Sequence, residues 1–146
     1  TRRRTQTHLH TRNGGGTRRS RIMAAAQATV LQNSAFSNVA RITSSTGGYM
    51  VAADVSALVY RVWEEMTGTV TTTGSTLQIS TTFSTLTSSS VVWPVDTTGY
   101  NFKHDVDGSV IPSADTTYIV EYEITPASGS RFFEQFTITT SVTKAT

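Results

Sequence analysis

Strict alternation of residue types near the C-terminus restricts most strongly the folds open to this chain. In the stretch TYIVEYEIT (117–125) both glutamates fall at odd positions. The even positions hold only aromatic or aliphatic residues: Tyr118, Val120, Tyr122 and Ile124. PASGS (126–130) supplies turn-forming residues, and RFFEQFTITTSV then resumes the alternation with Phe132, Phe136 and Ile138 on one parity. Two alternating runs joined by a short turn predict an antiparallel β-hairpin.

The rest of the chain after residue 48 repeats this pattern. SALVYRVWEE (56–65) alternates Leu58, Tyr60 and Val62 with Val59, Arg61 and Trp63, and TVTTTGSTLQIS (69–80) is rich in threonine. Threonine makes up 28 of the 146 residues and suits a solvated strand face. Six or seven short strands predict an all-β fold, a single antiparallel, immunoglobulin-like β-sandwich. We expect its core to include Tyr60, Val62, Val120, Tyr122, Ile124 and Phe136.

Charge divides the chain into unequal parts. Residues 1–21 carry seven arginines and no acid, a charge of +7. Residues 22–146 carry five Lys/Arg and all ten Asp/Glu, a charge of −5, and the sum is the overall +2. We therefore expect a flexible Arg/Gly-rich arm (1–21), an extended linker or arm that could contain a strand (22–48) and the β-sandwich (49–146).

The basic arm is the first candidate for binding a partner. It has no carboxylate with which to pair internally, and three consecutive glycines (14–16) separate its basic clusters. Arginine forms bidentate pairs with carboxylates and phosphates. The predicted partner-binding arginines are Arg2, Arg3, Arg4, Arg12, Arg18, Arg19 and Arg21.

Residues able to support catalysis are few. The chain has no cysteine and three histidines, of which His8 and His10 lie in the arm. His104 stands beside Asp105 in FKHDVDGS, but neighbours on a strand point to opposite faces. The DVDG stretch lacks the closing glutamate of a calcium loop and is typical of a polar turn. We predict no enzymatic activity, no metal and no cofactor. No apolar run is long enough to span a membrane.

Aromatic residues leave a binding role open. The aromatic side chains that could line a carbohydrate groove are Trp63, Trp93, Tyr100, Phe102, Phe132, Phe133 and Phe136. A sandwich core also needs such bulky residues, and we favour that interpretation. Trp93, which precedes Pro94, is the residue we expect to be partly exposed and to contact a partner.

Three segments give the chain a resemblance to a family. They are ADVSALVYRVWE, TTGYNFKHDV and DTTYIVEYEITPASGSRFF, within residues 51–139. GYNFKH (99–104) and TPASG (125–129) are the most specific of these. The chain resembles small β-sandwich proteins encoded among the structural genes of tailed bacteriophages, of the head decoration (cement) type. The arm lies outside this resemblance.

The resemblance implies a structural role in a virion. The expected location is the head surface, after synthesis in the host cytoplasm, and the expected partner is the major capsid protein or another virion subunit. Many copies, or a homo-oligomer, would occupy each particle. Packaged DNA is a second target for the arm, ranked below an acidic capsid surface. The alternatives are a tail or baseplate adaptor and a carbohydrate-binding module.

Overall fold

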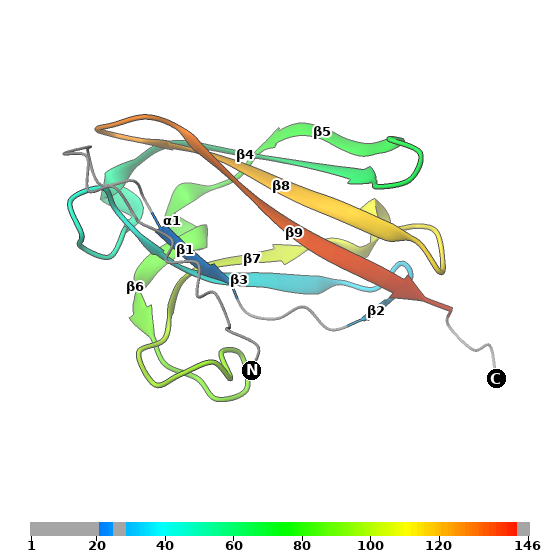
Figure 1. The fold of residues 1–146 in the computed structure, drawn as a ribbon, viewed down its shortest axis with the longest axis horizontal. Coiled ribbons are helices and arrows are strands. Elements are labelled where there is room, and N and C mark those ends of the chain that lie inside the picture. The colour runs from blue at the N-terminus through cyan, green and yellow to red at the C-terminus, as the bar shows by residue number, and fades with distance from the viewer. Residues whose placement is uncertain (1–20, 25–28, 143–146) are drawn as a thin grey trace, which may run out of the picture.

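The computed structural model describes residues 29–142 and the backbone of residues 21–24. Nine strands, one short helix and two 3₁₀ turns make up this part of the chain (Figure 1). In chain order they are β1 (Arg21–Ala24), β2 (Val30–Leu31), β3 (Phe36–Thr43), η1 (Ala52–Asp54), β4 (Val55–Glu64), β5 (Val70–Thr76), α1 (Ile79–Thr82), β6 (Phe83–Thr87), β7 (Tyr100–Val106), η2 (Gly108–Val110), β8 (Thr117–Pro126) and β9 (Phe132–Ser141).

The strands form two sheets. One has the order β1-β3-β7-β6 and the other the order β2-β9-β8-β4-β5. In Figure 1, β4 and β8 lie in the upper layer, and β3 and β7 lie in the lower one. The predicted all-β class is confirmed. One expectation is wrong: the pairing of β2 with β9 is parallel, whereas every other strand pairing in the described residues is antiparallel. β1 belongs to the four-stranded sheet, and β2, the next strand along the chain, lies at the edge of the five-stranded sheet.

The predicted C-terminal hairpin is confirmed. β8 and β9 pair from Thr117↔Thr139 to Ile124↔Phe132, and the connecting turn carries Gly129 at φ +106°. That left-handed conformation favours glycine. The hairpin places the even-numbered side chains of both strands on the inner face of the five-stranded sheet.

One core joins the two sheets. Leu58, Val120 and Ile124 of the five-stranded sheet belong to the same buried cluster as Ile42 and Phe102 of the four-stranded sheet. The predicted core residues Val62, Val120, Tyr122, Ile124 and Phe136 are all buried. Tyr60, the sixth, is only partly buried and packs against the cluster from its border. A phenol hydroxyl retains its need for a polar partner or water, which favours this border position.

The segment predicted as an extended linker or arm that could contain a strand (22–48) holds β3, an inner strand of its sheet. β3 lies between β1 and β7, and its residues Asn38, Val39, Ala40 and Ile42 are buried. The ordered β structure therefore starts before the predicted boundary at residue 49. Arg21, placed in the arm, is the first residue of β1 and pairs with Thr43. The remaining predictions for the arm concern residues 1–20, outside the described part.

Candidate functional site

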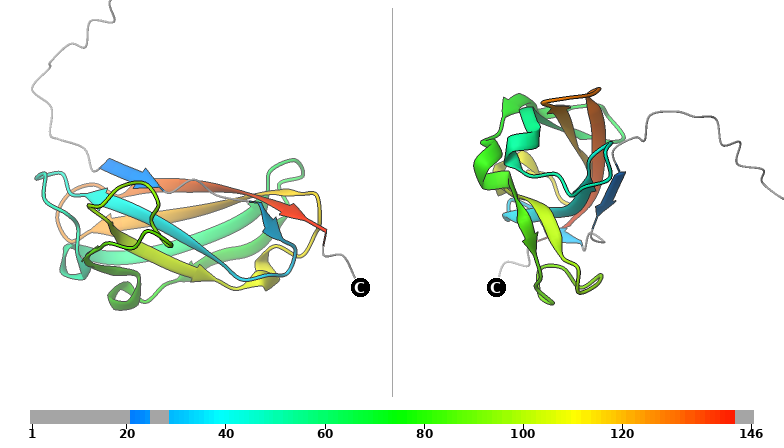
Figure 2. Two further views of the ribbon diagram at one scale, coloured as in Figure 1. Left: turned by 90° about the horizontal axis from the view of Figure 1, so that it is seen from below. Right: turned by 90° about the vertical axis from the view of Figure 1, so that its left-hand side faces the viewer.

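The loop between β6 and β7 (88–99) is fixed at its base by Trp93. This side chain is 0% exposed, so the prediction of a partly exposed ring is wrong. Trp93 N donates to the Ser89 carbonyl at 2.7 Å, and its ring lies 6.5 Å from that of Tyr100. The indole therefore faces the molecule and holds the loop, although Figures 1 and 2 show the loop projecting from the body of the protein.

One carboxylate oxygen gathers the donors of this loop. Asp96 Oδ1 accepts from Trp93 Nε1 at 2.9 Å, from Arg41 Nη1 at 2.8 Å and from the backbone N–H groups of Thr98 and Gly99 at 3.0 and 3.2 Å. Hydrogen bonds from Trp93 and then Arg41 lower the pKa of Asp96 to about 2. The carboxylate thus remains charged and connects the loop to β3.

Arg41 and Gly99 complete the anchor. The Arg41 guanidinium carbon lies 5.7 Å from the centre of the Trp93 ring, a cation–π contact. Its Nη1 also donates to the Gly99 carbonyl at 3.3 Å. Gly99 has φ +97°, and a Cβ at this position would lie 2.2 Å from the Thr87 carbonyl oxygen. Only glycine permits this close approach of the two ends of the loop.

The anchored loop presents apolar side chains to solvent. Val91 is 90% exposed and Val95 is 45% exposed, and Pro94 between them is also exposed. These three residues form the loop tip. Because the anchor already orders the backbone, less conformational entropy would be lost when a partner covers the tip. The loop tip is therefore a candidate contact surface.

A second polar cluster is buried between the sheets. Asn38 Nδ2 donates to Tyr122 Oη at 2.8 Å, and His104 Nδ1 lies 2.7 Å from the same oxygen. Since the Tyr122 oxygen accepts from Asn38, its proton is free to be donated to an unprotonated His104 Nδ1. Burial lowers the pKa of His104 to about 4 and raises that of Tyr122. The cluster therefore favours a neutral imidazole.

The acidic residues that follow His104 in the sequence lie as predicted. Asp105 points away from His104, is exposed and accepts from the Ser37 hydroxyl. Asp107 caps η2 by accepting from Ser109 N at 2.8 Å. The DVDG stretch is therefore a polar turn next to a strand. Within the described residues, no group of three or more His, Asp or Glu side chains is arranged to hold a metal ion.

Asn101 explains much of the GYNFKH segment. Its side-chain oxygen accepts from Ile42 N at 2.8 Å, and its Nδ2 donates to the carbonyls of Ile42 and Met50 at 2.8 and 2.6 Å. The buried amide thus joins β7 to β3 and to the loop that follows β3. With Gly99 at the loop base and Phe102 in the core, this segment stabilises the fold.

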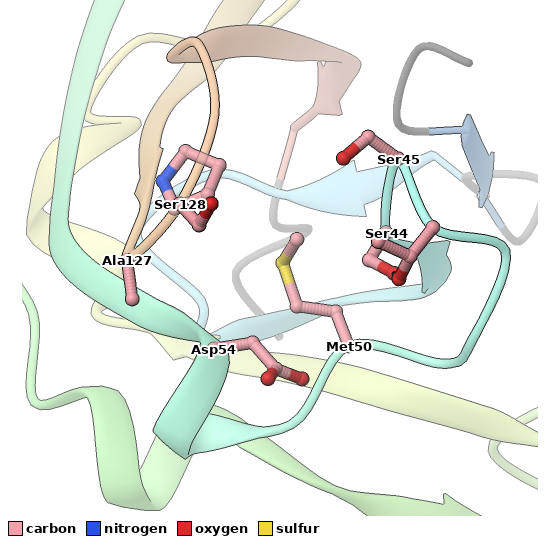
Figure 3. Close-up of a pocket in the computed structure, with 8 residues that line it drawn as sticks. Ser44, Ser45, Met50, Asp54, Ala127 and Ser128 are labelled. Carbon is pink, nitrogen blue, oxygen red and sulfur yellow. The ribbon is translucent and has the colours of Figure 1, made fainter. Parts of the chain in front are cut away.

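A small cavity lies between the loop after β3 and the turn joining β8 to β9 (Figure 3). Its volume is about 160 Å³, and hydroxyl groups, Met50 and Asp54 line it. Asp54 Oδ2 accepts from Val51 N at 2.9 Å and so supports the local turn. Sites for drug-sized ligands are usually about 300–1,000 Å³. This cavity suits at most a few waters or a small group.

Three of the seven aromatic side chains considered for a carbohydrate groove are buried, as the favoured core interpretation expects. Trp93, Phe102 and Phe136 are buried, whereas Phe133 is 48% exposed at the surface.

Of the described helices, none is long and apolar enough to cross a membrane. The comparisons with protein-family models, curated proteins and solved structures find no match. The function must therefore be inferred from the residues themselves.

Sequence reasoning missed the contact between Arg41 and Asp96. The two residues are 55 positions apart, and their pairing depends on how β3 lies beside the β6–β7 loop. The spacing of Trp93 and Asp96, three residues apart within a turn-rich stretch, was the available signal. A side-chain acceptor at that distance from a tryptophan can satisfy the indole N–H and allow the ring to be buried.

Proposed function

We propose that this protein is a structural component of a tailed-bacteriophage particle, a head decoration protein that binds and stabilises the capsid shell. Its fold would be a single immunoglobulin-like β-sandwich preceded by an extended basic arm. The observation that carries the proposal is the charge division, +7 in residues 1–21 against −5 in residues 22–146. The resemblance of the GYNFKH and TPASG segments supports the virion assignment.

The two parts of the chain suggest two contacts with the shell. Arginines of the arm would pair with carboxylates of the major capsid protein. The loop tip (Val91, Pro94 and Val95) would add an apolar contact held in place by Trp93 and Asp96. Such a role needs a stable domain and a tether, and the shared core of the two sheets fits the first requirement.

The arm can be tested in the full-length chain by changing charge alone. In one variant the six arginines of residues 1–20 become glutamine, and in its matched control they become lysine; Arg21 is kept because it begins β1. We expect the glutamine variant to dissociate from particles at much lower salt than the wild type. The lysine control should be released at intermediate salt, because it keeps the charge but loses the bidentate geometry. Equal retention of the glutamine variant and the wild type across a salt series would contradict the role of the arm.

The location on the particle needs a separate measurement. Immunoelectron microscopy of particles from the host that produces this protein should place the label on heads. Label confined to tails would instead assign the protein to the tail or baseplate. Because Trp93 is buried, the carbohydrate-binding alternative loses the residue on which it most depended.

A further inference from the structure

The small cavity shown in Figure 3 lies where segments from the two sheets meet. Ser44 and Ser45 come from the loop after β3, and Ala127 and Ser128 come from the turn that joins β8 to β9. A hydrogen bond of 2.8 Å from Ala127 N to the Asp54 carbonyl fixes this turn against η1. The walls of the cavity are therefore held in place by the fold itself.

The lining combines an apolar floor with a polar rim. Met50 and Pro126 are buried, whereas Thr46, Asp54 and Ser128 are exposed. Asp54 is the one charged side chain among the described residues that line the cavity. This combination suits an arginine or lysine side chain, because its methylene stem covers apolar surface while its charged head stays near water. The cavity is therefore suited to a single cationic side chain.

The first strand brings the basic part of the chain to this cavity. β1 is antiparallel to β3, and its first residue, Arg21, lies opposite Thr43, the last residue of β3. The next three residues after Thr43 are Ser44, Ser45 and Thr46, and all three line the cavity. In Figure 3, β1 (blue) lies on the same side of the cavity as Ser45. The sequence that precedes β1 is therefore joined to the fold beside the cavity.

The strand register distinguishes between the two arginines nearest to β1. Residue 22 pairs with Ile42, whose side chain is buried in the core. Alternate residues of a strand share a face. Continuing the direction of β1 therefore assigns Arg18 to the core side of the sheet and Arg19 to the outer side. The cavity lies on the core side, because Met50 on its floor belongs to the buried cluster between the sheets.

We propose that this cavity binds the side chain of Arg18 of the same chain, with its guanidinium paired to Asp54 and its stem lying over Met50. Arg18 stands three residues before Arg21, about 10 Å of extended chain. The cavity residues of the β3 loop lie within the corresponding three positions after Thr43. A guanidinium adds hydrogen bonds to the charge attraction of the carboxylate.

This contact would fix the root of the basic arm to the folded domain. It forms within one chain and does not depend on the proposed function. The arm would leave the domain at the end that carries the β8–β9 turn. The arginines of residues 1–20 that remain for a partner are Arg2, Arg3, Arg4, Arg12 and Arg19.

Nuclear magnetic resonance of the isotope-labelled full-length chain tests the contact directly. Each arginine gives an Nε–H signal, and the signals missing from Arg18→Lys and from Arg19→Lys identify these two residues. Asp54→Asn removes the charge but keeps an oxygen that can accept from Val51 N. We expect Asp54→Asn to shift the Arg18 signal and to leave the Arg19 signal in place.

The matched control for Asp54→Asn is Asp115→Asn, an exposed residue in the loop before β8. It should shift neither arginine signal. An Arg18 signal that stays in place in Asp54→Asn would overturn the proposal. Equal shifts of the Arg18 and Arg19 signals would overturn the assignment of Arg18 to the cavity.

Urea unfolding provides the energetic test. Arg18→Gln should lower the urea midpoint by a few tenths of a molar, whereas Arg19→Gln, the neighbour on the opposite face, should leave it unchanged. In the Asp54→Asn background, Arg18→Gln should have no further effect, because its partner is already neutral. An equal loss from Arg18→Gln in both backgrounds would overturn the pairing with Asp54.

The source of the guanidinium and the proposed function are tested separately. If the shift of the Arg18 signal disappears on dilution and sedimentation shows dimers, the arginine comes from a second copy and the contact within one chain is overturned. An Arg18 signal that is insensitive to Asp54→Asn, together with head labelling and salt-dependent retention on particles, would overturn this contact and leave the proposed function intact. A confirmed contact without any label on particles would do the reverse.

Discussion

Single residues in this protein hold together segments that are distant in the sequence. Asn101 joins β7 to β3 through two hydrogen bonds and to the loop after β3 through a third, and Gly99 allows the β6–β7 loop to close against Thr87. Neither role involves a large buried surface. Substitutions at these positions should therefore act through geometry and unsatisfied polar groups rather than through lost hydrophobic area.

Gly99→Ala should destabilise the protein. The added Cβ would meet the Thr87 carbonyl at 2.2 Å, and φ +97° is unfavourable for alanine. Backbone strain of this kind costs about 1–3 kcal/mol before any steric clash is counted. Urea unfolding would measure the loss. Gly48→Ala is the control, because a Cβ at Gly48 has no neighbour within 4 Å, and it should be nearly neutral. Equal stabilities of the two variants would contradict this account of Gly99.

His104 should make stability depend on pH between about 4 and 6.5. Burial lowers its pKa from 6.5 to about 4, so the unfolded chain binds a proton in this range and the folded protein does not. The contribution of His104 to stability is therefore fully present above pH 6.5 and is lost as the pH falls toward 4. The expected loss between pH 7 and pH 5 is about 2 kcal/mol.

The contribution of His104 can be isolated with a variant that does not titrate. Urea unfolding at pH 7 and pH 5 gives the change in the free energy of unfolding between the two pH values, for the wild type and for His104→Gln. The difference between these two changes is the contribution of His104. Carboxylates contribute equally to both proteins and cancel. A difference near zero would mean that the imidazole becomes protonated as readily in the fold as in the unfolded chain.

At the scale of elements, regular alternation was predictive and interrupted alternation was not. The β8–β9 hairpin was identified because every even position of TYIVEYEIT faces the core. The sequence around β3 spaces its apolar residues irregularly and so predicts only an extended linker or arm with a possible strand. In the structure the three consecutive residues Asn38, Val39 and Ala40 are all buried, which breaks the alternation. Asn38 is polar yet buried because Tyr122, 84 positions later, accepts its hydrogen bond. A pattern in one segment cannot reveal a partner that only tertiary structure supplies.

The β6–β7 loop is the element that should respond most to one substitution. Asp96→Ala removes the acceptor shared by Trp93, Arg41 and the backbone of Thr98 and Gly99. Hydrogen exchange of residues 88–99 should become faster, while exchange in β8 should change little. Glu65→Ala, at an exposed turn, is the control and should leave the loop unchanged. Unaltered exchange in the loop of Asp96→Ala would mean that the remaining contacts are sufficient to hold it.

At the scale of the whole molecule, the two sheets depend on one core. Phe102 of the four-stranded sheet packs edge-on against Tyr122 of the five-stranded sheet, with ring centres 4.9 Å apart. Residues of both sheets belong to a single buried cluster. Neither sheet could keep its inner face covered if the other separated from it. The described strands should therefore unfold as one cooperative unit.

The two tryptophans can test this cooperativity, because they report on different sheets. Trp63 lies in β4, whereas Trp93 contacts Arg41 of β3 and Tyr100 of β7. In Trp63→Phe and in Trp93→Phe, the fluorescence of the remaining tryptophan should follow the same urea transition as far-ultraviolet circular dichroism. Adding Ile124→Ala should lower the free energy of unfolding by about 2–5 kcal/mol through lost burial and a cavity. Both signals should shift together, because Ile124 is fully buried in the shared core. A fluorescence transition that separates from the dichroism transition in either variant would show that one sheet unfolds before the other.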